Sequence, residues 1–159
     1  MIDKERLFEY CTELLNQKIQ VHQRTLTDLK ESASNETRST AGDKHETALA
    51  MLQIEQKNTS LQLDHLLIQK STLERIKPSG VSSQVANGTP ERSQVANGTL
   101  VKTTQGNFYI SIPLGKITFE KQKLVALSAE SPLGSKLMGL TVGEGFSFNS
   151  VNYIIQRIK

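Results

Sequence analysis

The chain has 159 residues, of which 36% are hydrophobic and 5% aromatic, and its formal net charge is +3. This length fits one domain or two small ones, and it excludes a large barrel or a doubly wound catalytic domain. Because the apolar fraction lies below the ~45–50% usual in globular chains, we expect an elongated or partly exposed architecture rather than one deep core.

The N-terminal segment and the single cysteine indicate the cellular compartment. The first six residues mix both charges without an apolar stretch, which argues against a secretory signal. No apolar run approaches the ~18 residues that a membrane-spanning helix needs. Cys11 has no second cysteine to pair with, and it lies in a helical apolar pattern, so we expect a buried, inert thiol. The sequence therefore predicts a cytoplasmic protein without membrane contact.

The helical spacing of apolar residues predicts two long helices, over residues 4–29 and 46–76. Both apolar stripes are narrow, which favours an antiparallel two-helix coiled coil about 45 Å long. Polar residues within the second stripe weaken self-association, so we expect a monomer. The first stripe consists of Phe8, Cys11, Leu15, Ile19, Leu26 and Leu29; the second consists of Leu49, Leu52, Leu63, Leu66 and Leu73, with Gln56, Thr59 and Lys70 in the same seam.

A turn near residues 31–46 forms the tip of this hairpin, because Ser, Thr, Asn and Gly gather there and the apolar period stops. The composition then changes after residue 77: all four prolines and nine of the ten glycines follow it. Residues 1–77 carry eleven Lys and Arg against twelve Asp and Glu, whereas residues 78–159 carry eight against four. The net charges of −1 and +4 indicate a helical hairpin domain over 1–77, followed by a turn-rich basic part.

Residues 78–98 are interpreted as a linker that contains a duplication. The run Ser-Gln-Val-Ala-Asn-Gly-Thr occurs at 83–89 and again at 93–99. Two copies are too few for a repeat architecture, so we interpret them as a lengthened surface loop. We expect one copy to lead into the first strand of the next domain, and the sequence leaves open which one.

Residues 99–159 are predicted to form a small α+β domain with a mostly antiparallel sheet. Ser131 is a candidate helix N-cap before Pro132, and Gly139 ends the short helix. The predicted strands cover residues 100–104, 108–112, 116–120, 124–128, 142–149 and 151–158.

Candidate chemistry is sparse and centres on the tip. The chain contains no P-loop and no dinucleotide-binding glycine motif, and His22, His45 and His65 lack metal-ligand spacing. Asp43 and Glu46 lie three residues apart at the predicted start of the second helix, and therefore on one face of its first turn. This pair can supply oxygen ligands to Mg²⁺, or it can form a capping box with Asp43 as N-cap. Both interpretations stay open.

Two runs resemble the GreA/GreB-type family of bacterial transcript cleavage factors. Residues 42–48, Gly-Asp-Lys-His-Glu-Thr-Ala, are similar to the family's G-D-x-x-E-N-A stretch. Residues 131–144, Ser-Pro-Leu-Gly-Ser-Lys-Leu-Met-Gly-Leu-Thr-Val-Gly-Glu, are similar to its S-P-[IL]-G-x-x-L-[LM]-G-x-x-x-G-[DE] run. The resemblance implies an N-terminal coiled-coil hairpin followed by an FKBP-like C-terminal domain over residues 99–159.

The resemblance also implies a function for the tip. A factor of this family binds bacterial RNA polymerase, inserts its coiled coil into the secondary channel and contacts the nascent RNA indirectly. Asp43 and Glu46 would then be the catalytic and metal-binding residues, holding a second Mg²⁺ in the polymerase's own active site during cleavage of backtracked RNA. The chain itself would not be an enzyme and would not bind Mg²⁺ stably alone.

Alternatives remain open at this point. The family usually continues after Ala48 with an acidic residue and an aromatic one, where this chain has Leu49 and Ala50. A Gre-like protein that modulates or inhibits the polymerase without cleavage is therefore one alternative. A coiled-coil interaction module unrelated to polymerase is another. An FKBP-type prolyl isomerase rests on fold analogy alone.

Overall fold

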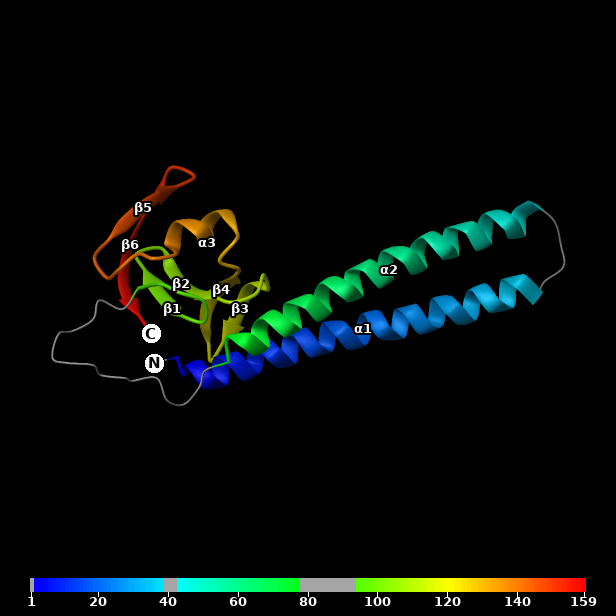
Figure 1. Ribbon diagram of the computed structural model, residues 1–159, viewed down its shortest axis with the longest axis horizontal. Helices are drawn as coiled ribbons and strands as arrows, with labels where there is room; N and C mark the ends of the chain where they lie inside the picture. Colours follow the sequence, from blue (N-terminus) through cyan, green and yellow to red (C-terminus); the bar gives the residue numbers. More distant parts are fainter. Residues whose placement is uncertain (1, 39–42, 78–93) are drawn as a thin grey trace. The chain divides into compact units, whose positions relative to one another are not determined.

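The computed structural model describes residues 2–38, 43–77 and 94–159 (Figure 1), except for the side chains of residues 37, 38 and 43–45. The chain forms two compact units, Met1–Thr12 with Thr72–Lys159, and Glu13–Ser71. The start of the first helix and the end of the second thus belong to the same unit as the sheet. In the described part of the chain, no helix is both long enough and apolar enough to cross a bilayer.

The hairpin is made by α1, Lys4–Arg38, and α2, Asp43–Arg75 (Figure 1). The two helices run antiparallel, since residues later in α1 contact residues earlier in α2. The Gln56 side-chain amide donates to the Leu29 carbonyl oxygen at 3.0 Å, and the His22 ring is hydrogen-bonded to the Gln62 side chain. Every residue of both predicted stripes is buried or half-buried. The stripe residues between 13 and 71 belong to the hairpin unit, as the predicted seam requires, whereas Phe8, Cys11 and Leu73 belong to the sheet unit.

Helix α1 extends beyond its predicted end at residue 29. The apolar period does stop there, but residues 30–38 retain Glu31, Ala33 and Glu36, and adding residues to an existing helix costs little. The prediction was wrong because it took the end of the seam as the end of the helix. Residues 39–42 of the predicted tip lie outside the described residues.

The second unit contains a six-stranded sheet in the order β3-β4-β2-β1-β6-β5 and one short helix. The predicted α+β fold class is confirmed: a helical hairpin precedes a small sheet domain with one short helix. All pairs are antiparallel except β2 with β4, which are parallel. The elements are β1 Leu100–Thr103, β2 Gly106–Ile110, β3 Gly115–Phe119, β4 Gln122–Leu127, α3 Pro132–Leu137, β5 Gly145–Phe148 and β6 Val151–Ile158.

Strand β5 begins at Gly145 rather than at the predicted residue 142. Gly143 adopts a φ of +91°, which interrupts extended backbone. The Thr141 N–H donates to Glu144 Oε2 at 2.6 Å, which holds the turn that precedes the strand. Val142 is consequently exposed in a turn instead of starting a strand.

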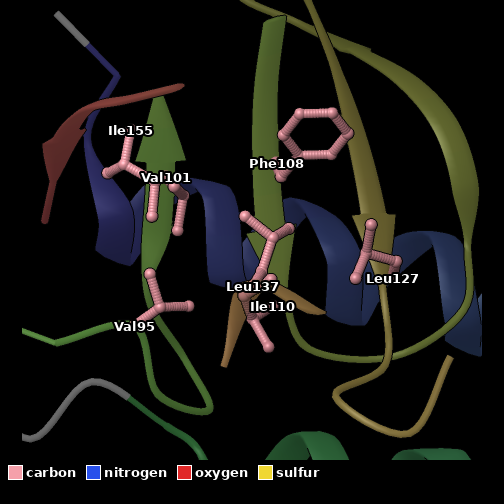
Figure 2. Packing of buried hydrophobic residues seen from close by; sticks show 7 residues of the cluster. All are labelled: Val95, Val101, Phe108, Ile110, Leu127, Leu137 and Ile155. Atoms are coloured by element: carbon pink, nitrogen blue, oxygen red, sulfur yellow. The ribbon is translucent and has the colours of Figure 1, made fainter. Parts of the chain in front are cut away.

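One face of the sheet packs against α3. Alternate residues of the central strands point to this face, where Leu137 of α3 covers them (Figure 2). The cluster consists of Val95, Val101, Phe108, Ile110, Leu127, Leu137 and Ile155.

The opposite face is covered by the first turns of α1. Tyr10 packs on Phe119 with ring centroids 5.3 Å apart, and Arg6 forms an ion pair with Glu120. The remaining strand residues alternate toward this side, and Leu7 is fully buried. The buried residues here are Ile2, Leu7, Phe8, Cys11, Leu73, Leu100, Tyr109, Phe119, Leu124 and Ala126.

The second copy of the duplicated run leads into β1. Val95 is buried in the core, its N–H donates to the Leu140 carbonyl at 2.9 Å, and its own carbonyl accepts from the Gly139 N–H at 2.9 Å. Gly98 turns the chain toward β1 with a φ of +82°. The first copy, residues 83–89, lies outside the described residues.

Candidate functional site at the start of the second helix

The two predicted site residues share the first turn of α2. Helix α2 begins at Asp43, and Glu46 follows three residues later, which is the spacing of neighbours on one helix face. The Glu46 side chain is exposed. The side chain of Asp43 lies outside the described residues, so the structure places its backbone and not its carboxylate.

A carboxylate at this position suits two roles. The N-terminus of a helix carries a partial positive charge that stabilises a nearby anion, which favours a cap. An exposed carboxylate also keeps free lone pairs for a hard cation, but Mg²⁺ demands an octahedral set of oxygens that two side chains cannot complete. Both the cap and the ligand therefore stay predictions, and the ligand role needs further oxygens from a partner. Among the residues described, no group of three or more His, Cys, Asp or Glu side chains is arranged to hold a metal ion.

The histidines of the hairpin have local roles. His22 Nε2 lies 3.0 Å from Gln62 Oε1, and its Nδ1 lies 2.9 Å from the Lys18 carbonyl oxygen, so both ring nitrogens are engaged. His65 is exposed on α2. His22 therefore bridges the two helices and His65 lies on the surface of the hairpin, whereas the side chain of His45 lies outside the described residues.

Cys11 is fully buried, as predicted, between the start of α1 and the sheet. Burial raises the pKa of its thiol to about 12. The nucleophilic thiolate is therefore scarce at neutral pH, and this cysteine is not a candidate for covalent chemistry.

The Ser-Pro-Leu-Gly run has a packing role that explains its sequence. Ser131 Oγ caps α3 by accepting from the Gly134 N–H at 3.0 Å, and it donates to the Ser128 carbonyl at 2.7 Å. Pro132 occupies the first helical turn, where its missing N–H costs nothing. A Cβ on Gly134 would lie only 2.0 Å from the Ser128 carbonyl oxygen. This part of the family-like run is thus required by local structure.

Helix α2 also exposes an apolar stripe that was not predicted from the sequence. Ile54 and Ile68 are 61% and 65% exposed, and Leu61 lies midway between them at heptad spacing. These three residues, with positions 51, 58 and 65, form a second a/d pattern beside the seam. The signal was present in the sequence, because 54, 61 and 68 repeat every seven residues. The exposed large apolar residues of α2 are Met51, Ile54, Leu61, Leu67 and Ile68.

Comparisons with known proteins give only distant similarity. No family model matches the chain, and no curated protein matches it. Among solved structures, the GreA factor homolog 1 (Gfh1) of Thermus thermophilus is 16% identical, with a TM-score of 0.35, over 93% of this chain and 94% of that one.

Two further structures are similar at the same level. One is the transcription factor Gfh1, with 16% identity and a TM-score of 0.33 over 92% of each chain. The other is Gfh1 of Thermus aquaticus, with 14% identity and a TM-score of 0.32 over 92% of each chain. TM-scores this low do not establish a common fold.

Proposed function

We propose that this protein is a Gre-like transcription factor that binds bacterial RNA polymerase and inserts its helical hairpin into the secondary channel. The observation that carries the proposal is the exposed Glu46 in the first turn of α2, three residues after Asp43, at the end of a long hairpin. The two motifs that resemble the GreA/GreB-type family support it.

The hairpin is long and narrow enough for the two carboxylates at its tip to reach a site inside a partner protein. Helix α2 has 33 residues, which corresponds to about 50 Å. Its seam with α1 buries Leu15, Ile19 and Leu29, so two helices stiffen one another without a wider bundle. An arm of this kind can enter a channel that a globular domain cannot.

At the tip, Asp43 and Glu46 would hold a Mg²⁺ shared with the polymerase's own carboxylates. When bound, that ion supplies the second metal of a two-metal phosphodiester hydrolysis. The chain's contribution is two carboxylates on adjacent positions of one helical turn, completing a coordination shell begun by the partner. On this proposal the chain is not an enzyme by itself.

The test is transcript cleavage in stalled, backtracked bacterial elongation complexes. The wild-type protein is expected to accelerate release of short 3′ RNA fragments. Asp43→Asn and Glu46→Gln are each expected to reduce this stimulation at least tenfold, with retention on polymerase unchanged. Asp28→Asn, on the exposed face of α1, is the matched control and keeps full stimulation.

Two results separate the parts of the proposal. If the protein binds polymerase and slows elongation but does not stimulate transcript cleavage, the cleavage role is wrong. The inhibitory role that Leu49 and Ala50 leave open then takes its place. Failure of the wild-type protein to bind polymerase contradicts the proposal as a whole.

The exposed stripe on α2 favours a second candidate, in which the hairpin pairs with a second copy of itself. An antiparallel pair of α2 helices, centred between residues 58 and 61, places each Leu61 in an apolar seam. It also brings Lys57 of one copy near Asp64 of the other, so the flanking charges are complementary. Light scattering would then give twice the chain mass, and Leu61→Asp would restore a monomer. A monomeric wild-type protein contradicts this candidate.

A further inference from the structure

Two cations face each other across neighbouring strands of the sheet. In the β1–β6 ladder, Lys102 is directly opposite Arg157, and both side chains are exposed. Like charges in directly opposed positions destabilise a sheet. The pair therefore has a cost that packing does not explain.

The same two residues line a pocket with a volume of about 230 Å³. A third cation, Lys159, lines it as well, and its Nζ is held by a hydrogen bond to the Ile2 carbonyl oxygen at 3.3 Å. The full lining consists of Ile2, Leu100, Lys102, Asn107, Gln122, Arg157 and Lys159. The pocket thus combines three cations and two amide side chains with two apolar residues.

A fourth cation lies close to this group. Burial and the charge of Lys159 lower the pKa of Lys4, so the two ammonium groups repel each other. Two acids are engaged elsewhere: Asp3 Oδ1 accepts from the Glu5 and Arg6 N–H groups, and Glu120 pairs with Arg6. Within the described ranges, these cations form no ion pair with a carboxylate.

We propose that this pocket binds a phosphoryl anion, of which a diphosphate group is the best match. The guanidinium of Arg157 offers a planar pair of donors, and the lysines add point charges suited to phosphate oxygens. The Asn107 and Gln122 amides can donate further hydrogen bonds. A single carboxylate would leave most of the positive charge unbalanced. The lining residues all belong to the sheet unit, and the site does not depend on the proposed function.

The test is calorimetric titration of the full-length protein with inorganic diphosphate in metal-free buffer at low salt. The double variant Lys102→Gln/Arg157→Gln is expected to bind at least tenfold more weakly than wild type. The matched control, Lys116→Gln/Lys136→Gln, removes two exposed cations outside the pocket lining and is expected to stay within twofold of wild type. Orthophosphate and citrate serve as comparison anions, both expected to bind more weakly than diphosphate.

Three outcomes would overturn the proposal: no diphosphate binding by wild type, equal weakening in both double variants, or citrate binding as tightly as diphosphate. The first means that the pocket is not an anion site. The second means that diphosphate binding comes from the general positive charge of the surface. The third means that the pocket has no preference for phosphoryl oxygens.

Thermal unfolding gives an independent measurement. Without ligand, Lys102→Gln is expected to raise the melting temperature by a few degrees, because it removes the like-charge pair. With diphosphate, the wild-type melting temperature rises and that of Lys102→Gln/Arg157→Gln does not, since only the folded pocket binds the anion. If Lys102→Gln lowers the melting temperature without ligand, the repulsion between Lys102 and Arg157 on which the proposal is based is contradicted.

Discussion

At the scale of single residues, Gly134 shows how a sequence motif and a packing requirement coincide. Its hypothetical Cβ would meet the Ser128 carbonyl oxygen at 2.0 Å and Ser131 Oγ at 2.8 Å. Both neighbours are fixed, since the Ser131 hydroxyl bonds to the Ser128 carbonyl and to the Gly134 N–H. A glycine is needed here because the helix start lies against backbone, whatever the protein binds.

Gly134→Ala is therefore expected to lower the free energy of unfolding by about 3 kcal/mol, because α3 must move away from its cap. Urea denaturation measures this difference. Ser135→Ala, one position further in the same helix and exposed, is expected to change the unfolding free energy by only about 0.5 kcal/mol. Equal stabilities of the two variants would show that the close approach is not maintained in solution.

The buried thiol of Cys11 predicts a pH dependence. Its pKa is raised from 9.0 to about 12 in the folded protein, so the folded state keeps the proton that the unfolded chain loses. The resulting stability is complete below about pH 9 and is lost between about pH 9 and 12. Denaturation across this range should show a steeper loss for wild type than for Cys11→Ala. Parallel slopes for the two proteins would contradict the burial of the thiol.

At the scale of elements, α1 has two different neighbours along its length. From Leu15 to Leu29 its apolar residues belong to the seam with α2. Its first turns instead cover the face of the sheet that α3 leaves open, through Leu7 and the Tyr10–Phe119 contact. The sheet domain is thus incomplete without the beginning of the hairpin.

Leu7→Ala is expected to reduce the unfolding free energy of the sheet unit by about 3 kcal/mol, because it leaves a cavity against a fully buried face. Val21→Ala is the control in the same helix: Val21 is 59% exposed, so about 0.5 kcal/mol or less is expected. Circular dichroism in the near-ultraviolet, which follows the tyrosines near the sheet, measures both. A Leu7→Ala protein as stable as Val21→Ala would contradict this packing.

The elements were predictable where one local rule decides them. Apolar periodicity located both helices, and turn residues located the strands, while the Ser131-Pro132 cap fixed the start of α3. The end of α1 and the start of β5 were wrong because helix propensity and the positive φ of Gly143 overrode the pattern.

The candidate sites differ in the same way. The spacing of Asp43 and Glu46 was enough to place them on one turn. The cationic pocket was not predictable, since it depends on the register that sets Lys102 opposite Arg157, two residues far apart in the sequence.

At the scale of the whole molecule, acidic and basic chemistry belong to different units. The exposed Glu46 belongs to the hairpin unit, whereas Lys102, Arg157 and Lys159 belong to the sheet unit. This division gives a physical basis to the −1 and +4 charges of the two parts of the sequence. It is consistent with a protein that carries out its proposed chemistry at the tip and makes other contacts through its sheet domain.

The central claim, that the tip enters the polymerase, is tested most directly by localised cleavage from position 46. The single native cysteine is buried, so a Cys11→Ala/Glu46→Cys protein carries one exposed thiol that can be labelled with an iron chelate. Bound to a backtracked elongation complex, the label is predicted to generate radical cuts in the polymerase chains next to their catalytic metal site. Cuts confined to the outer surface of the polymerase, or none above the unlabelled control, would contradict the account.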